Sequence, residues 1–331
     1  MDGERLDGVI DPASLVISER HDTSRARVRH NCDLEFLRKW TNPTTSDAAT
    51  HPQFVAIVNP LRRATLGRVI RQRARNRLKW ELGIVLALSY GASGVYAIVA
   101  IIDRLTRETA LASQTTTINR PLDDRAIFDL VYQLLGIAFG LAPVALVIYL
   151  LWQRHRPHLW RLGLSSPSGG PGRPWWIGEA GGGLLLAAAI GVPGLGFYLF
   201  SRAIGINLNV VPTALDAYWW TAPLLVLSAL RAALGEELIV VVYVFDRLRR
   251  IGVGPWATIV SSALLRGSYH LYQGFGGFAG NVVMGIVFGW VYQRWGRSLP
   301  LIVAHWVLDI VSFVGYPLAV SLWPTFFAVA G

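Results

Sequence analysis

Long hydrophobic segments separated by short polar connections occupy most of this chain of 331 residues. From about Trp80 onward, apolar runs of roughly 20 residues recur, and an α-helix needs this length to cross a bilayer. The pattern predicts an all-α fold, a polytopic integral membrane helical bundle with about eight transmembrane helices. The predicted spans are 80–102, 127–152, 176–200, 219–244, 255–273, 277–293, 298–315 and 316–330.

The segment before the first span has a different character. Residues 1–79 mix Asp, Ser, Thr, Arg and Pro without sustained periodicity, which predicts a mostly disordered basic arm ahead of a transmembrane domain at 80–331. Within this arm, Leu61–Lys79 fits either a basic helix on an anionic membrane surface or a solvated linker. The arm has no short apolar core followed by small residues, so we expect no cleavable signal peptide.

Composition and charge bear on the partners of the protein. Hydrophobic residues make up 53% of the chain, and Cys32 is its only cysteine, so the chain cannot form an internal disulfide or a thiolate metal cluster. The net charge of +10 could attract nucleic acid or anionic lipid, but the arginines cluster beside the hydrophobic spans. Such positions are typical of topology signals, so we expect membrane lipids and no nucleic acid as partners.

The charged connections predict an orientation. With the N-terminus in the cytoplasm, the basic connections all fall on the cytoplasmic side, and the outer connections are poor in charge or nearly balanced. The basic connections are 153–175, 245–254 and 293–297, and the outer ones are 103–126, 201–218 and 274–276. Because the arginine-rich composition is typical of GC-rich bacteria, we expect a multi-pass protein of the bacterial inner (plasma) membrane.

Ionisable side chains inside the spans are the strongest functional signal. Each costs roughly 2.5 kcal/mol or more at the centre of a membrane helix, so these residues indicate a functional site by default. They concentrate in the fourth, fifth and seventh predicted spans, as Arg231, Glu236, Glu237, Arg266, His270, His305 and Asp309. One such residue could serve helix packing alone, but the whole set predicts a shared site.

The spacing of these residues indicates how they share a cavity. Each histidine has a charged residue four positions away, on the same helix face: Arg266 precedes His270, and Asp309 follows His305. The two adjacent glutamates point about 100° apart on a regular helix. One glutamate can therefore enter the cavity while the other ties its helix to a neighbour.

A carboxylate and two imidazoles in a water-filled pocket have two hydrolytic uses. The carboxylate can activate water as a general base, or all three groups can bind a divalent metal such as zinc. The metal-binding set would be Glu236, His270 and His305. The same residue types also form proton or cation relays across membranes, so transport is a competing interpretation.

The order of these residues resembles the CPBP family, also called ABI, which contains CAAX prenyl proteases and bacteriocin-processing enzymes. The resemblance covers residues 219–315. Motif one of the family, EExxxR, stands here as Glu236–Val241, motif two, FxxxH, as Arg266–His270, and motif three, HxxxN or HxxxD, as His305–Asp309.

The resemblance implies an eight-helix fold with a conical cavity open to the cytoplasm and a catalytic set of five residues. Glu236 then activates the hydrolytic water beside Glu237, while His270 and His305 orient the water or bind a metal. Asp309 occupies a position where the family often has an asparagine that stabilises the oxyanion. Because an ionised aspartate would repel that oxyanion, Asp309 is protonated, bound to a metal, or serves only to orient His305.

Two positions depart from the family motifs. Val241 replaces the arginine of motif one, and Arg266 replaces the phenylalanine of motif two. We predict that Arg266 is a supporting residue, which supplies in space the charge missing at position 241 and pairs with Glu237. The competing interpretation is that the site has decayed and the protein is a non-catalytic relative.

Helix depth argues against convergence of the two histidines. From the predicted cytoplasmic helix ends, Glu236 and His305 lie about 10–13 Å deep, but His270 lies about 22 Å deep. Either the fifth helix starts well inside the membrane after Pro255, or helix tilt closes the gap.

The sequence thus predicts an intramembrane endopeptidase that hydrolyses a peptide bond of a membrane-associated peptide or protein. It requires either no cofactor or a divalent metal. Two alternatives stay open: a catalytically inactive CPBP-like scaffold or immunity protein, and a proton or ion relay or transporter.

Overall fold

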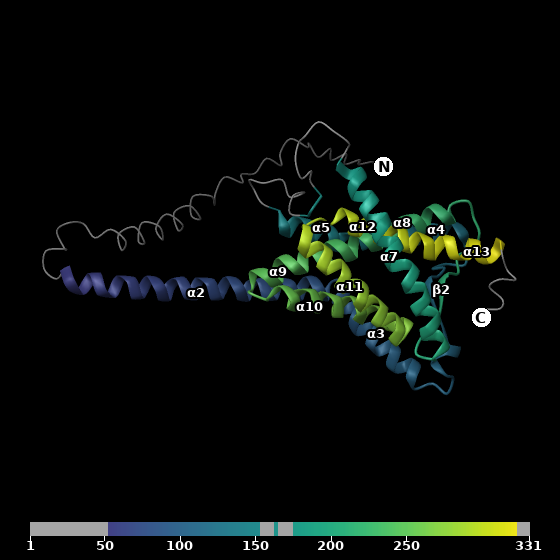
Figure 1. Cartoon of the computed structure of the whole chain (residues 1–331), viewed down its shortest axis with the longest axis horizontal. Coiled ribbons are helices and arrows are strands. Elements are labelled where there is room, and N and C mark those ends of the chain that lie inside the picture. The colour runs from purple at the N-terminus through teal and green to yellow at the C-terminus, as the bar shows by residue number, and fades with distance from the viewer. Residues whose placement is uncertain (1–51, 153–161, 165–174, 323–331) are drawn as a thin grey trace, which may run out of the picture. The chain divides into compact units, whose positions relative to one another are not determined.

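The structure is a computed structural model that describes residues 52–152, 162–164 and 175–322. The chain divides into two units, Met1–Arg71 and Gln72–Gly331. Helices make up nearly all of the described regular structure (Figure 1). The α-helices are α2 (Pro52–Ala87), α3 (Tyr90–Leu105), α4 (Ala126–Gly140), α5 (Ala142–Leu151), α7 (Trp175–Ala203), α8 (Thr221–Gly235), α9 (Val244–Arg250), α10 (Pro255–His270), α11 (Phe275–Trp295), α12 (Leu299–Ile310) and α13 (Tyr316–Leu322).

Short elements complete the described fold. The π-helices η3 (Glu236–Tyr243) and η5 (Val311–Gly315) join consecutive α-helices without a break, and η2 (Leu111–Ser113) and η4 (Leu271–Gln273) are single 3₁₀ turns. The strands β1 (Thr115–Asn119) and β2 (Asn209–Thr213) pair in parallel.

Among the described residues, four helical stretches are long and apolar enough to cross a membrane. They are Ala126–Leu151, Trp176–Ala203, Phe275–Trp295 and Leu299–Ala319, and a fifth is counted if the pair Arg71–Ala87 and Tyr90–Leu105, bent by 53°, forms one span. Large apolar side chains on these helices, such as Leu185 and Val192, are exposed. Exposed apolar helix faces suit a lipid environment, so the predicted all-α, polytopic membrane bundle is confirmed.

This count is below the eight predicted spans. One predicted span is a short helix, another carries charged residues in its interior, and two others form one continuous helix. The α10 helix has only 16 residues, and the continuous stretch from α8 to α9 carries both glutamates of motif one in its interior. The predicted spans 298–315 and 316–330 are not separate in the described residues. The chain stays helical from α12 through η5 into α13, so the predicted break at 315 is wrong.

The arm predicted before the first span is helical from Pro52, where α2 begins. The Leu61–Lys79 segment, predicted to be either a basic helix or a solvated linker, lies within this helix. The prediction of disorder for the remainder of the arm concerns residues 1–51, which lie outside the described residues.

Three connections predicted on the outer side are joined to one another. The parallel pairing of β1 with β2 places Thr115 opposite Asn209, and thereby joins the connections 103–126 and 201–218. Asn207 forms a bridge with Gly274, and its Oδ1 atom accepts a hydrogen bond of 2.7 Å from the Gly277 N–H group. The positive φ of Gly274, 113°, explains the glycine there. All three connections therefore lie at one end of the bundle.

The basic connections gather in a second group. Ser298 donates a hydrogen bond to the carbonyl oxygen of Leu162, which joins the connections around 162 and 296. The Arg247 Nη2 atom donates to the Leu150 carbonyl oxygen at 3.0 Å, which fixes the end of α9 against the end of α5. The predicted grouping of connections into two sets thus agrees with these contacts.

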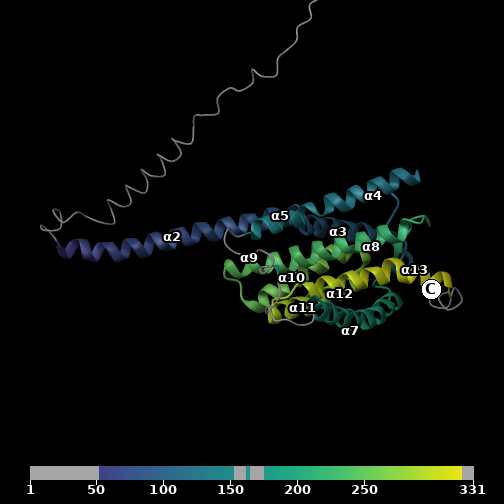
Figure 2. The same cartoon turned by 90° about the horizontal axis from the view of Figure 1, so that it is seen from above.

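The helices that carry the ionisable residues are neighbours (Figure 2). The α10 helix contacts α3, α11 and η3, while α12 contacts α7 and α8. Glycines allow the close approach of α7 to α12: a Cβ atom on Gly183 would lie 2.7 Å from Val303 Cβ, and one on Gly191 would lie 2.7 Å from Leu308 Cδ2. This packing holds α12, with His305, against the rest of the site.

Candidate active site

The two glutamates of motif one begin a π-helix. The α8 helix ends at Gly235, and the wider turn of η3 starts at Glu236. Such π segments often occur at functional sites, and they shift backbone carbonyls away from their usual helical partners. Here the Ser262 hydroxyl of α10 donates to the Val240 carbonyl oxygen at 2.7 Å. The π-helix is thereby tied to α10 at the level of the site.

Arg266 of α10 reaches both carboxylates. Its Nη2 atom lies 2.5 Å from Glu237 Oε1, and its Nη1 atom lies 3.6 Å from Glu236 Oε2. The Arg266 side chain is only 1% exposed, and its guanidinium lies 5.3 Å from the centre of the Phe288 ring. The predicted pairing of Arg266 with Glu237 is therefore present. The guanidinium offsets the high cost of burying two adjacent carboxylates.

His305 of α12 lies between two carboxylates. Its Nδ1 atom donates a hydrogen bond of 2.8 Å to Glu237 Oε1, the same oxygen that Arg266 contacts. Its Nε2 atom lies 3.6 Å from Asp309 Oδ2, one helical turn further along α12. Because the carboxylate accepts the hydrogen of Nδ1, the orientation of the ring is fixed, and Nε2 is left for other contacts.

Glu236 and Glu237 differ in their surroundings. Glu237 is fully enclosed, whereas Glu236 keeps 6% of its surface exposed. The Glu236 Oε2 atom accepts a hydrogen bond of 2.7 Å from the Tyr269 hydroxyl. Its Oε1 atom has no hydrogen-bond partner in the described part of the chain. Each glutamate thus has one oxygen without a hydrogen-bond partner among the described residues, but only Glu236 is partly exposed, while Glu237 holds α10 and α12 together.

His270, the last residue of α10, faces the same carboxylate. Its Nδ1 atom donates to the Arg266 carbonyl oxygen at 3.0 Å, so Nε2 is the nitrogen that can accept a hydrogen bond. Glu236 lies within electrostatic range of both His270 and His305. The structure therefore brings together all five predicted catalytic residues and Arg266.

The predicted difference in depth between Glu236 and His270 disappears because the fourth helix is longer than its hydrophobic pattern indicates. The helix continues through α9 to Arg250 instead of ending at 244. Glu236 lies fourteen residues before Arg250, and His270 lies fifteen residues after Pro255. At about 1.5 Å per residue, both lie about 21–22 Å from the turn that joins the two helices.

The surroundings of Val241 are apolar. Val241 is buried in an apolar cluster with Phe288, Leu301 and Ala304. Arg266 lies over the ring of the same Phe288. Val241 and Arg266 therefore lie near the same apolar cluster, and the positive charge in this region comes from α10 instead of from η3.

Two tyrosines of the site are missed by motif reasoning. Tyr269 lies inside motif two, at a position that the motif leaves open, and its hydroxyl binds Glu236. Tyr90, at the start of α3, places its ring 4.7 Å from the Tyr269 ring. No local pattern identifies Tyr90, since it is far from the motifs in sequence. The feature that distinguishes Tyr90 is its position next to a helix bend.

The predicted metal set does not fit this geometry. The described residues contain no group of three or more His, Cys, Asp and Glu side chains arranged to hold a metal ion. The Arg266 guanidinium lies beside both glutamates and would repel a divalent cation at that place. The arrangement of Glu236, His270 and His305 in the structure therefore does not suit a divalent metal ion.

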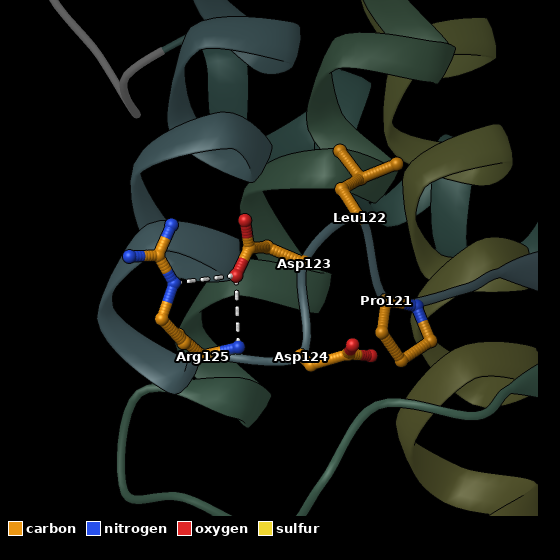
Figure 3. Close-up of a pocket in the computed structure, with 5 residues that line it drawn as sticks. All are labelled: Pro121, Leu122, Asp123, Asp124 and Arg125. Carbon is orange, nitrogen blue, oxygen red and sulfur yellow. Dashed lines mark hydrogen bonds and ion pairs between the residues drawn. The ribbon is translucent and has the colours of Figure 1, made fainter.

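A shallow pocket on the surface is separate from this cluster. It is lined by residues 121–125, in the turn before α4 (Figure 3). Asp123 Oδ1 accepts hydrogen bonds from the Arg125 N–H group at 2.9 Å and from Arg125 Nε at 3.2 Å (Figure 3). These hydrogen bonds lower the pKa of the Asp123 carboxyl. The contacts explain the turn, and the pocket shares no residue with the candidate site.

A multi-pass helical protein with a buried cluster of carboxylates and imidazoles has the architecture expected of an intramembrane hydrolase. Residues 218–311 match the family model described as Rce1-like, Type II CAAX prenyl endopeptidase Rce1-like. The predicted resemblance to the CPBP family is therefore confirmed for this stretch, which contains all of the site residues predicted from the sequence. The family supports a protease that acts on a peptide or protein in the membrane. No curated protein and no solved structure matches the chain.

Proposed function

We propose that this protein is an intramembrane endopeptidase in which Glu236 activates the hydrolytic water. The observation that carries the proposal is the difference between the two glutamates. Glu236 has one oxygen held by Tyr269 and one oxygen without a partner at a partly exposed side chain, while Glu237 binds Arg266 and His305 and is fully buried. A general base needs an accessible lone pair on a carboxylate whose orientation is fixed.

The proposed reaction is hydrolysis of one peptide bond. Glu236 Oε1 takes a proton from water as the water oxygen attacks the carbonyl carbon of the scissile bond. The tetrahedral intermediate then collapses, the C–N bond breaks, and the proton on Glu236 passes to the leaving nitrogen. The products are a carboxylic acid and an amine, and the Glu236 carboxylate is regenerated.

His305 is the proposed electrostatic partner of the intermediate. Its Nδ1 atom is held by Glu237, so Nε2 keeps a fixed direction. A ring that carries protons on both nitrogens can donate from Nε2 to the oxyanion as negative charge develops there. Glu237 and Arg266 then act through His305, because their ion pair fixes the position of its ring.

His270 and Asp309 have proposed supporting roles. With its Nδ1 hydrogen bound to the Arg266 carbonyl oxygen, His270 can accept a hydrogen bond from water at Nε2. Asp309 lies 3.6 Å from His305 Nε2, which favours the role of orienting His305 among the three roles that the sequence leaves open. An ionised Asp309 next to the oxyanion would be unfavourable.

The substrate is proposed to be a membrane-associated peptide or small protein. The site is packed among candidate membrane-spanning helices, since α10 contacts α11 and α12 contacts α7, so a substrate in the same bilayer could reach it without crossing water. We further propose a bacterial inner membrane location with the N-terminus in the cytoplasm. The arginines at 247–250 and 294–297, which lie in the group of basic connections, support this orientation.

Cleavage of a library of membrane-protein peptides by the purified protein in detergent tests the proposal. We expect wild-type protein to cleave some peptides and Glu236→Gln to lower kcat by at least about 100-fold. The matched control is Glu179→Gln, which removes a carboxylate that binds Arg297 Nε at 2.9 Å outside the site. This control should keep cleavage activity.

Three results would contradict the proposal. A folded wild-type protein that cleaves no peptide would favour an inactive scaffold. Cleavage that persists in Glu236→Gln at the wild-type rate would exclude Glu236 as the base. Ion movement across proteoliposomes without any peptide cleavage would favour the relay or transporter instead.

A further inference from the structure

Tyr269 makes a single hydrogen bond, and that bond is to the proposed base. Its hydroxyl donates to Glu236 Oε2 at 2.7 Å, and its side chain is buried. Within the described residues the hydroxyl has no other hydrogen-bond partner. A buried phenol needs one partner, and the partner here is a carboxylate oxygen that also lies 3.6 Å from Arg266 Nη1.

The Tyr269 ring is held on two sides by aromatic rings. The centre of the Tyr90 ring lies 4.7 Å away, and that of the His270 ring lies 4.8 Å away. Tyr90 lies directly after the bend that separates α2 from α3. Ring pairs at such distances add packing energy to the burial of the rings, so the phenol has little freedom to move.

Two glycines permit this close packing. A Cβ atom on Gly235 would lie 2.3 Å from the Tyr90 hydroxyl oxygen, so only glycine leaves room for that ring next to Glu236. A Cβ atom on Gly94 of α3 would lie 2.6 Å from the Ser268 hydroxyl oxygen, on the neighbouring residue of α10. The α3 helix therefore approaches both η3 and α10 closely enough to fix Tyr269.

We infer that Tyr269 is a positioning residue for Glu236, held in place by Tyr90. This inference rests on the proposed function. The phenol occupies Oε2 and fixes the plane of the carboxylate, so that Oε1 is the oxygen available to water. The hydrogen bond also keeps Oε2 apart from the Arg266 guanidinium, whose Nη1 atom has no hydrogen-bond partner among the described residues.

Removal of the phenol has a specific consequence. Without the Tyr269 hydroxyl, Glu236 Oε2 keeps its 3.6 Å contact with Arg266 Nη1, and the carboxylate can rotate towards that donor. Rotation moves Oε1 from the position of the attacking water and weakens the contact of Arg266 with Glu237. Misplacement of a reacting group by about 1 Å costs about 100-fold in rate.

The test is Tyr269→Phe, with Tyr243→Phe as the matched control. Tyr243 donates to Glu81 Oε1 at 3.1 Å, so the control also removes a tyrosine–glutamate hydrogen bond, at a place outside the site. We expect Tyr269→Phe to lower kcat by about 10-fold to 100-fold with KM nearly unchanged. The pH dependence of kcat should change as well. Tyr243→Phe should leave kcat and the pH dependence unchanged.

The outcomes separate this inference from the proposed function. If Glu236→Gln abolishes cleavage while Tyr269→Phe keeps the wild-type kcat and pH dependence, only the role of Tyr269 is overturned. If both tyrosine variants lose kcat in proportion to their loss of thermal stability, Tyr269 is merely structural and the inference is again overturned. A folded wild-type protein that cleaves no peptide, or cleavage that persists in Glu236→Gln, overturns both.

Discussion

The Oε1 atom of Glu237 is shared by two side chains from different helices, because Arg266 Nη2 lies 2.5 Å away and His305 Nδ1 lies 2.8 Å away. This shared oxygen connects η3 to both α10 and α12. Removal of one partner leaves the other groups buried with an unbalanced charge. The fold and the proposed chemistry therefore depend on the same contact.

Arg266→Leu should destabilise the protein and abolish cleavage. The change leaves two buried glutamates without their cation, and loss of one partner of a buried pair costs about 3–5 kcal/mol. Thermal unfolding in detergent measures the first effect, and the peptide assay measures the second. An Arg266→Leu variant that stays folded and active would show that the pair has no such role.

A double substitution tests whether Arg266 replaces the motif-one arginine. Val241→Arg alone should destabilise the protein, because it places a second cation in the apolar cluster around Phe288. Val241→Arg combined with Arg266→Phe restores both family motifs and should recover more stability and cleavage than either single change. If the stability and cleavage of the double variant are no better than the sum of the two single effects predicts, the idea that Arg266 supplies the charge missing at position 241 is contradicted.

Asp309→Asn should keep cleavage at or above the wild-type rate. The asparagine keeps a polar group near His305 Nε2, and it removes the negative charge that opposes the oxyanion. Asp309→Leu should lower kcat by about 10-fold, since it removes the second of the two carboxylates that orient the His305 ring. Equal rates for the two variants would exclude a role of Asp309 in orienting His305.

Chelation should leave cleavage unchanged. The arginine beside both glutamates disfavours a divalent cation there, so water activation by Glu236 does not require one. Incubation with a strong chelator followed by the peptide assay measures this, with a zinc protease as the positive control for the chelator. Loss of activity that added zinc restores would instead assign a metal to the site.

Gly183→Ala should destabilise the bundle, whereas Gly182→Ala should not. A Cβ atom on Gly183 would meet α12 at Val303, while one on Gly182 would have no atom within 4 Å. Overpacking of this kind costs about 1–3 kcal/mol, and alanine in an open helical position is favourable by up to about 1 kcal/mol. Thermal unfolding of the two variants compares neighbours on the same helix.

Cysteine labelling tests the predicted orientation in intact cells. In a Cys32→Ser background, Glu108→Cys and Asp216→Cys should react with a membrane-impermeant reagent added outside. Arg249→Cys and Arg294→Cys should react only after the membrane is permeabilised. All four native side chains are exposed, so differences in labelling report the side of the membrane. The opposite pattern would place the N-terminus outside.

Hydropathy and residue type predict much of this protein because both are local properties of the chain. Apolar runs predict membrane helices, and the order of glutamates, histidines and aspartate predicts the candidate site, whose members the fold brings together. The predicted end of the fourth helix at 244 is wrong, because the arginines after it are compatible with a helix that continues beyond its apolar part. That error alone produced the apparent difference in depth between Glu236 and His270.

The sequence by itself determined the membrane class, the helical fold and which polar residues are too expensive to be buried without a purpose. Only the tertiary structure decided that Arg266 pairs with Glu237, that the Tyr269 hydroxyl binds Glu236 beside the Tyr90 ring, and that the two adjacent glutamates have different partners. Hydropathy evaluates each segment alone, whereas a buried charge is stabilised by partners on other helices. Those partners are set by packing over long sequence distances, which no local pattern records.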